Sequence, residues 1–312
     1  MNALAARARA LAPAAAVALA LALGVSQTLD AANGDWLLLT TAGLVSAALV
    51  DGFTTRSTTP APPEEPGTFT TLAAPATVVV QAPKLGNQPD ENEDAYAVDV
   101  QHGCYVVSDG ASSSFASRAW AQALCGAFVE APSTAWSFDD FAACVAEADG
   151  VWRAGQASAS DMPWWAEEGL RRGAHATIAV LSLGVRGDQR IWRAAAVGDS
   201  CVFQLRASAT GWTIVCSMPL RDARMFSGHP SLLHTGASPT TADIVVAEGT
   251  AIEGDVFVLA TDAVAEWILR DPANVAPAAV GSSSELQSTF DALRERVELD
   301  NDDLTLLRVA IP

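Results

Sequence analysis

The sequence predicts an α+β fold in which two antiparallel sheets pack face to face with helices on their outer sides, as a four-layer α-β-β-α sandwich. Two observations favour this fold. Short segments of strand-forming residues follow one another as hairpins, whereas segments with helical periodicity come in pairs instead of alternating singly with strands. In addition, half of the 312 residues are hydrophobic, so the chain can bury a large core.

Residues 1–53 are predicted to form an apolar membrane anchor. No charged residue occurs from Ala10 to Leu29, a length of roughly 20 residues that can cross a bilayer as a helix. A second apolar segment, Trp36 to Val50, is short for a span but favours a helical hairpin with both ends in the cytoplasm. A signal peptide, or a single anchor with the rest of the chain outside, are the alternatives.

The basic start and the cysteines favour a cytoplasmic main domain. Arg7 and Arg9 precede the first apolar segment, which keeps the N-terminus inside. The five cysteines are odd in number and form no CxxC pair, which fits a reducing compartment better than a disulfide framework. We therefore expect a membrane-anchored protein with a cytoplasmic main domain; a soluble cytoplasmic or an exported protein is the alternative.

Residues 54–75 are rich in Pro, Thr and Glu without periodicity and predict a linker, followed by the main domain at 76–312. Helices are expected at 113–130, 138–156, 164–172, 263–269 and 284–299. Strands are expected at 77–81, 95–100, 104–109, 176–183, 191–199, 201–206, 212–217, 243–247, 255–262 and 304–310.

The charge balance excludes some partners and favours others. A formal net charge of -18 argues against a nucleic-acid surface, which needs clustered Lys and Arg. The four histidines form no HxxxH or HExxH pattern, which argues against a zinc site. An acidic excess of this size suits a protein that recruits other divalent cations.

Acidic residues stand at five separate ends of the expected strands. They are Glu93 and Asp94, Asp109, Asp199, Asp262, and Asp302 with Asp303. A single such residue is usually a helix N-cap or a turn residue. Five strand ends that converge would repel one another strongly unless cations lie between them. Hard oxygen ligands of this kind select Mg²⁺ or Mn²⁺.

Six segments resemble, in order and approximate spacing, the motifs of the metal-dependent Ser/Thr protein phosphatases of type 2C, also called PPM-type phosphatases. They are NEDAYAV, YVVSDGASSS, AHATIAVLSL, AAAVGDSCVFQLR, DVFVLATDAV and DNDDLTLLRV. The resemblance covers Val78 to Ile311. It implies a bacterial signalling enzyme that hydrolyses phosphoserine or phosphothreonine on proteins and holds two Mn²⁺ or Mg²⁺ ions in a cleft at one edge of a β-sandwich.

The resemblance also implies roles for the acidic strand ends. Asp109 would bridge the two ions, and the carbonyl of Gly110 would ligate one of them. Asp262 and Asp302 would hold the other ion.

Three further acidic residues complete the set implied by the resemblance. Glu93 and Asp94 would bind waters on the first ion, and Asp199 can support a third, looser ion. A water between two divalent ions has a lowered pKa and attacks phosphorus in line, so Asp109 and Asp94 are the residues expected to take part in catalysis.

The sequence departs from the family pattern at four positions. Ala111 replaces the His that is thought to protonate the leaving group, and Pro89 replaces the Arg that binds the substrate phosphate, with Gln88 and Lys84 nearby. Ala263 and Asp303 replace a Gly and an Asn. His175 is a candidate substitute for the missing acid, although a lone His at a strand start is more often structural.

Two functions follow from these observations. The retained carboxylates favour an active phosphatase acting on a phosphoprotein. The loss of the acid and the phosphate clamp favours a pseudophosphatase, which would bind phosphoproteins as a regulatory module without turnover. The sequence does not indicate the target protein or the oligomeric state.

Overall fold

The computed structural model describes residues 70–72, 75–130, 137–156 and 164–312. All of them belong to one compact unit, Pro66–Pro312. The expected apolar anchor at 1–53 lies outside the described residues, so the anchor and the cytoplasmic location stay predictions. No helix within the described ranges is long and apolar enough to span a membrane.

The first sheet has the strand order β11-β7-β6-β4-β3, with β1 added beside β6. All its neighbouring strands pair antiparallel. Its strands are β1 (Thr70–Thr71), β3 (Ala95–Asp99), β4 (Cys104–Ser108), β6 (Ile178–Arg186), β7 (Gln189–Val197) and β11 (Val245–Ala251). Strand β1 falls inside the segment expected to be a linker.

The second sheet has the order β2-β13-β12-β8-β9 and is also antiparallel throughout. Its strands are β2 (Ala76–Ala82), β8 (Cys201–Ser208), β9 (Gly211–Met218), β12 (Val256–Ala260) and β13 (Leu304–Ala310). A separate short pair joins β5 (His175–Ala176) to β10 (Leu233–His234).

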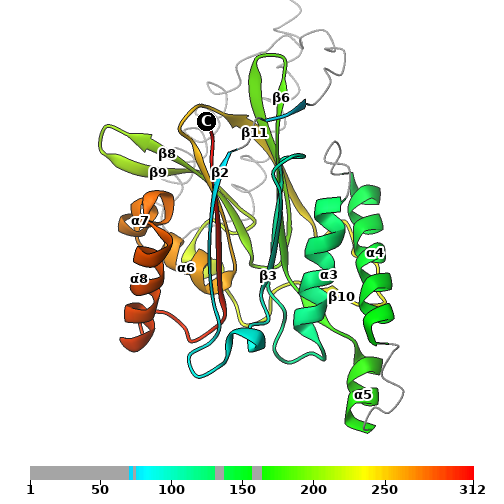
Figure 1. Ribbon diagram of the computed structural model, residues 1–312. Helices are drawn as coiled ribbons and strands as arrows, with labels where there is room; N and C mark the ends of the chain where they lie inside the picture. The colour runs from blue at the N-terminus through cyan, green and yellow to red at the C-terminus, as the bar shows by residue number, and fades with distance from the viewer. Residues whose placement is uncertain (1–69, 73–74, 131–136, 157–163) are drawn as a thin grey trace, which may run out of the picture. The chain divides into compact units, whose positions relative to one another are not determined.

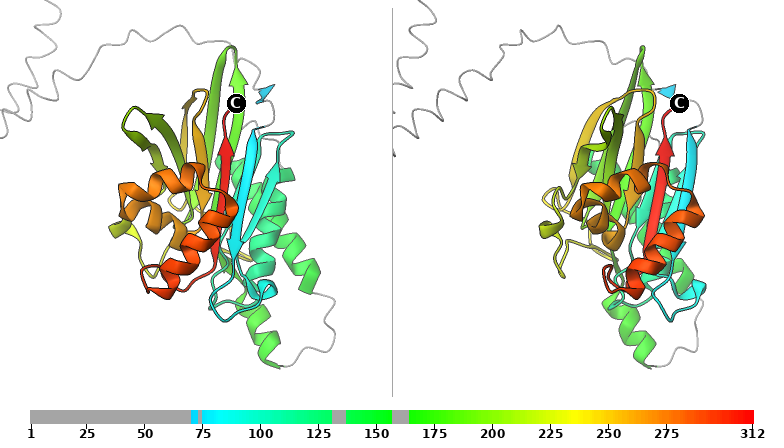
Figure 2. Two further views of the ribbon diagram at one scale, coloured as in Figure 1. Left: turned by 60° about the vertical axis from the view of Figure 1, so that its left-hand side comes forward. Right: turned by 90° about the vertical axis from the view of Figure 1, so that its left-hand side faces the viewer.

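Helices cover the outer face of each sheet (Figures 1 and 2). Helices α3 (Ser117–Glu130) and α4 (Phe138–Gln156) lie on the side of the first sheet, and α5 (Trp164–Arg172) lies beyond the end of α4. Helices α6 (Asp262–Arg270), α7 (Val275–Val280) and α8 (Ser283–Glu295) lie on the side of the second sheet. Three short 3₁₀ helices occur at Pro89–Glu91, Ala223–Met225 and Pro272–Asn274.

The alternation of side chains along each strand builds the layers. In β4, Cys104 and Val106 pack against the helices, whereas Tyr105 belongs to the core between the two sheets. In β13, Leu306 faces the helices and Leu307 faces the other sheet, and both are fully buried. Because both faces of these strands are buried, the predicted four-layer arrangement of two antiparallel sheets between helices is confirmed for the described residues.

The segment 176–183, expected to be a single strand, forms two. Strand β5 ends at Ala176 and β6 begins at Ile178. Between them, the amide of Thr177 donates to the carbonyl of Asp109 at 2.9 Å, and its hydroxyl pairs with that of Ser200 at 2.6 Å. These tertiary hydrogen bonds accompany a break between β5 and β6, and β5 pairs with β10 instead of the sheet. No sequence pattern predicted this break.

The last helix is shorter than expected, since α8 ends at Glu295 and not at 299. Val297 adopts a left-handed conformation with φ of 57°, which stops the helix. The amides of Val297 and Glu298 donate to the carbonyls of Arg294 and Leu293 at 3.0 and 2.9 Å, a Schellman motif. Helix α7 was not predicted because it is short and carries Pro277 in its first turn, where proline is tolerated.

The buried layer between the sheets should dominate the stability of the domain. Replacing Leu307 by Ala removes a fully buried side chain and should lower the free energy of unfolding by about 2–5 kcal/mol in a urea titration. The same substitution at Leu85, whose side chain is 48% exposed, should cost less than about 0.5 kcal/mol. Equal losses at both positions would contradict the layered core.

Candidate metal centre

The strand registers bring the acidic positions to the same edge of the sandwich. In the first sheet Ala95 pairs with Ser108, so the start of β3 and the end of β4 lie side by side. In the second sheet Ala260 pairs with both Cys201 and Leu306, which aligns the end of β12 with the starts of β8 and β13. Each acidic residue identified in the sequence lies within a few residues of one of these strand ends.

Asp94 connects the two sheets at this edge. Its Oδ2 accepts hydrogen bonds from the hydroxyls of Thr261 at 2.9 Å and Thr305 at 2.8 Å, both from the second sheet. Its Oδ1 is buried and has no hydrogen-bond partner among the described residues. Burial raises the pKa of Asp94 to about 7, although the two threonine hydroxyls oppose the shift; the charges of Asp303 and Asp302 add to it.

The other carboxylates raise one another's pKa as well. Burial, followed by the charges of Asp94, Asp262, Asp302 and Asp199, raises the pKa of Asp109 well above its usual value. Burial and the charges of Asp302, Asp199 and Asp94 raise the pKa of Asp262 to about 8. Burial, with a contribution from Asp302, raises the pKa of Asp199 to about 6. These five carboxylates are therefore one electrostatic unit.

We refer to Glu93, Asp94, Asp109, Asp199, Asp262 and Asp302 as the acidic cluster. Glu93 is its peripheral member: its Oε1 accepts from the Ser117 hydroxyl at 2.5 Å, and its backbone amide donates to Asp303 at 2.8 Å. Asp303 has only 3% of its surface exposed, and its second carboxylate oxygen accepts from the amide of Lys84 at 2.8 Å. Asp303 thus ties two loops together and is not free to face a cation.

Gly110 is required by close packing. A Cβ atom at this position would lie 2.8 Å from the carbonyl oxygen of Glu93 and 2.8 Å from the carbonyl carbon of Ser117. Both neighbours are backbone atoms that cannot move aside, so a larger residue would push the start of α3 away from the acidic cluster. This explains why the strand ending in Asp109 is followed by a glycine.

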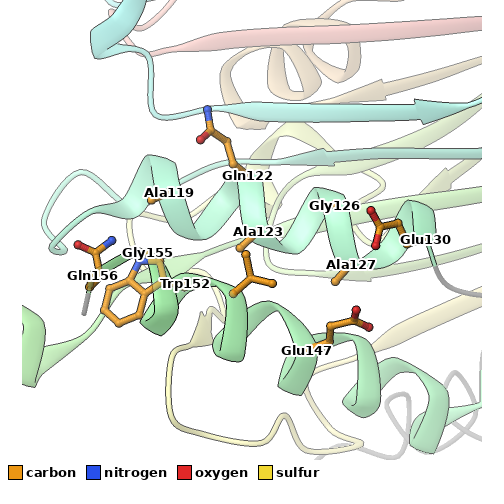
Figure 3. Close-up of a pocket in the computed structure, with 11 residues that line it drawn as sticks. Ala119, Gln122, Ala123, Gly126, Ala127, Glu130, Glu147, Trp152, Gly155 and Gln156 are labelled. Atoms are coloured by element: carbon orange, nitrogen blue, oxygen red, sulfur yellow. The ribbon is translucent and has the colours of Figure 1, made fainter. Parts of the chain in front are cut away.

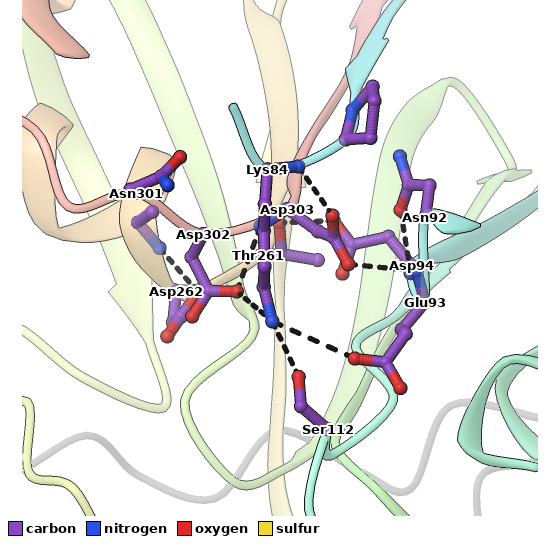
Figure 4. A network of polar contacts seen from close by, with 12 residues as sticks. Lys84, Asn92, Glu93, Asp94, Ser112, Thr261, Asp262, Asn301, Asp302 and Asp303 are labelled. Atoms are coloured by element: carbon purple, nitrogen blue, oxygen red, sulfur yellow. Dashed lines mark hydrogen bonds and ion pairs between the residues drawn. The ribbon is translucent and has the colours of Figure 1, made fainter. Parts of the chain in front are cut away.

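Lys84, the only lysine of the whole chain, lies among the carboxylates of the acidic cluster. Its ammonium nitrogen is 3.1 Å from an oxygen of Asp302 and 3.7 Å from one of Glu93, and it donates to the Ser112 hydroxyl at 2.5 Å (Figure 4). Burial disfavours the charged form and by itself would lower the pKa of Lys84. The hydrogen bond to Asp302 and the negative charges of Asp302, Asp303 and Glu93 outweigh this effect, so the pKa of Lys84 is raised. The sequence showed Lys84 only as a basic residue near Pro89, the position of the missing arginine, and did not predict its contact with Asp302.

The chemistry of the cluster fits a hard divalent cation. Within the described ranges, no three His, Cys, Asp or Glu side chains are close enough together to enclose a cation as they stand. However, the donors are carboxylate and carbonyl oxygens, which Mg²⁺ and Mn²⁺ prefer, and the buried Oδ1 of Asp94 lacks a partner. Asp109, the Gly110 carbonyl, Asp262 and Asp302 would hold such ions, with the other cluster members around them.

His175 lies beside the position where the expected acid is missing. The amide of Ala111 donates to the His175 carbonyl at 2.9 Å, and Gly110 pairs with Ala176 in an antiparallel bridge. This register puts His175 opposite Ala111, the position of the missing acid, and Thr177 opposite Asp109. The His175 ring packs on that of His234 with centroids 4.3 Å apart; burial and His234 lower the pKa of His175.

Two of the hollows among the described residues border α3 or the loop before it. One, of about 510 Å³, borders the loop after Asp109 and is lined by Ser113, Ser114, Phe115, Glu168, Arg172 and His175, with Gly169 and Gly173. The other, of about 350 Å³, lies between α3 and α4 and is lined by small residues such as Ala123 and Gly126 and by larger ones such as Glu147 and Trp152 (Figure 3). Neither hollow is lined by a member of the acidic cluster, but the first begins only a few residues after Asp109 and Gly110.

No protein-family model matches the chain, and no curated protein matches it. Among solved structures, it is similar to the serine/threonine phosphatase Stp1 from Staphylococcus aureus, with 12% identity, a TM-score of 0.55, and coverage of 80% of this chain and 99% of that one. It is also similar to the Mycobacterium tuberculosis serine/threonine phosphatase PstP, with 15% identity, a TM-score of 0.52, and coverage of 76% and 98%.

A third similar structure is PppA, a regulatory component of the type VI secretion system of Pseudomonas aeruginosa. It has 18% identity and a TM-score of 0.50, and the match covers 77% of this chain and 98% of that one. A catalytic domain of PstP crystallised with two manganese ions matches at 13% identity and a TM-score of 0.50, over 75% of this chain and 97% of that one. The described domain therefore has the fold of the metal-dependent type-2C Ser/Thr protein phosphatases.

Proposed function

We propose that this protein is a Mn²⁺- or Mg²⁺-dependent phosphatase that removes phosphate from phosphoserine or phosphothreonine on proteins. The observation that carries the proposal is the convergence of carboxylates from both sheets at one edge of a phosphatase fold. Such a cluster is costly without cations, because each buried charge raises the energy of the others. Bound there, divalent cations would supply a water of lowered pKa and neutralise the phosphoryl oxygens.

The residues of the chain supply position and shape. Thr261 and Thr305 hold Asp94 by one oxygen, and its other oxygen is buried without a hydrogen-bond partner among the described residues. Asp303 fixes the backbone of Glu93. The hollow of about 510 Å³ beside Ser114 and His175 borders the loop after Asp109, and we expect it to receive residues of a protein substrate that flank the phosphorylated side chain.

The alternative is a pseudophosphatase that binds phosphoproteins without turnover. Its support is the methyl side chain of Ala111, which supplies no proton to a leaving alkoxide. The loss of a general acid costs about 10² to 10⁴ in rate when protonation limits the step. His175 is the described residue best placed to offset this loss, since it lies directly across from Ala111.

Turnover should depend on the metal and on Asp109. With Mn²⁺, the full chain should hydrolyse an aryl phosphate, and a chelator should stop the reaction. Replacing Asp109 by Asn should lower the rate by at least about 10²-fold, because the residue expected to bridge the ions is lost. Asp188→Asn, in the exposed turn between β6 and β7, is the matched control and should retain full activity. Absence of metal-dependent turnover would favour the pseudophosphatase.

The leaving group should influence the rate strongly. Because Ala111 donates no proton, an aryl phosphate should react at least about 10²-fold faster than a phosphoserine peptide. A flat dependence on leaving-group pKa would contradict this expectation and would indicate that another residue supplies the proton. His175→Gln then identifies the donor: the dependence becomes steep in this variant if His175 is that residue, and it is unchanged otherwise.

Stability without metal should fall as the pH rises. The raised pKa values of Asp199, Asp94 and Asp262, about 6, 7 and 8, mean that the folded chain holds protons which the unfolded chain has released above about pH 4. The unfolded state therefore binds fewer protons, and stability decreases from about pH 4 to pH 8. Thermal unfolding in chelator should show this slope, Asp262→Asn should flatten it, and Mg²⁺ should restore stability at pH 8. A metal-free melting temperature independent of pH would refute the prediction.

A further inference from the structure

The Lys84 ammonium lies between the two sides of the acidic cluster. Asp302, 3.1 Å from the nitrogen, precedes β13 of the second sheet, whereas Glu93 and Ser112 belong to segments next to β3 and β4 of the first sheet. Figure 4 shows the Lys84 side chain running between Asp302 and Asp262 on one side and Glu93 on the other. The Lys84 ammonium thus contacts carboxylates on both sides of the cluster where divalent cations are expected to bind.

The backbone delivers Lys84 to this place. Its amide donates to Asp303 at 2.8 Å, and the next amide, that of Leu85, donates to the side chain of Asn301 at 2.6 Å. These bonds hold the segment after β2 against the segment before β13. The position of the ammonium is therefore built into the fold and does not depend on a free surface side chain.

Arg294 reinforces the same arrangement from α8. It is 5% exposed, and its guanidinium donates to the carbonyl of Pro83 at 3.0 Å and to the carbonyl of Asp302. The buried Arg294 side chain thereby holds Pro83, the residue before Lys84, close to the backbone of Asp302. The short distance between Lys84 and Asp302 follows from this clamp.

The choice of lysine at this position is informative. The chain has 18 basic residues, and 17 of them are arginine. Arginine binds carboxylates through a planar fork that fixes both partners, whereas lysine carries a compact, strongly hydrated charge on a flexible stem. A lysine ammonium can therefore leave the carboxylates and return with little change in the surrounding structure.

We infer that the Lys84 ammonium is an internal cation that occupies the acidic cluster in the metal-free protein and competes with divalent cations for Asp302 and Glu93. The inference rests on the metal dependence proposed above, but not on turnover. Binding of a divalent ion to these carboxylates displaces the ammonium from them, and removal of the ion lets it return.

Competition of this kind lowers the apparent affinity for metal. Only the fraction of molecules in which Lys84 has left the carboxylates is ready to bind, so the observed dissociation constant is the intrinsic one divided by that fraction. The same contact limits the mutual repulsion of Asp302 and Glu93 when no metal is present. Lys84 therefore stabilises the metal-free protein and weakens the affinity of the cluster for metal at the same time.

Calorimetric titration of the full chain with Mn²⁺ tests the competition. Lys84→Met keeps most of the aliphatic stem and removes the charge, so it should bind Mn²⁺ about fivefold tighter or more. Lys84→Arg keeps the charge and should bind no tighter than the unaltered chain. In chelator, Lys84→Met should melt at a lower temperature than the unaltered chain, and saturating Mn²⁺ should raise its melting temperature by a larger interval. Equal or weaker Mn²⁺ binding by Lys84→Met would overturn the inference.

The single lysine allows a second test that needs no variant. Lysine labelled with ¹³C at the ε position gives one side-chain signal in the full chain, since Lys84 is the only lysine. Diamagnetic Mg²⁺ should shift this signal toward that of a solvated lysine and narrow it. A signal that stays unchanged at saturating Mg²⁺ would overturn the inference, even if Lys84→Met did not fold.

Neither measurement depends on phosphate release. If the Lys84 signal moves with Mg²⁺ but no phosphate ester is hydrolysed, the competition stands and the proposed phosphatase activity fails. If esters are hydrolysed and the signal does not move, the activity stands and the competition fails.

Discussion

Repulsion among carboxylates at one edge of the β-sandwich is the constraint on which the rest of this structure depends. Asp94, Asp109, Asp199 and Asp262 are partly or wholly removed from water, and burial together with the charges of neighbouring carboxylates makes the ionisation of each of them harder. A chain would not gain stability from such a group by itself. Divalent cations bound at this edge, as proposed above, would relieve the repulsion.

The surrounding structure makes this edge rigid enough to tolerate the repulsion. The carboxylates project from the ends of strands whose two faces are both buried, so they cannot spread apart without disturbing the core. Thr261, Thr305 and Asp303 tie the loops of one sheet to those of the other. Lys84 adds a positive charge in contact with Asp302 and Glu93.

Local patterns predicted most elements because burial on one or both faces leaves a regular mark on the sequence. Helices α4 and α5 match the expected bounds, and β13 does too. The failures have a different cause. Strand β5 separates from β6 through bonds to Asp109, and α8 is stopped by the backbone of Val297, neither of which alters the hydrophobic pattern. The order of the acidic motifs also predicted the fold family, although identity to known structures is below 20%.

The sequence by itself determined which residues carry charge at strand ends and which faces of the strands are apolar, because these are local properties of the chain. Tertiary structure alone decided which charges meet. Lys84 is 218 residues from Asp302 along the chain, and the partnership of Asp94 with Thr261 and Thr305 joins two sheets. Such contacts depend on strand register and loop closure across the whole domain, so no local pattern encodes them.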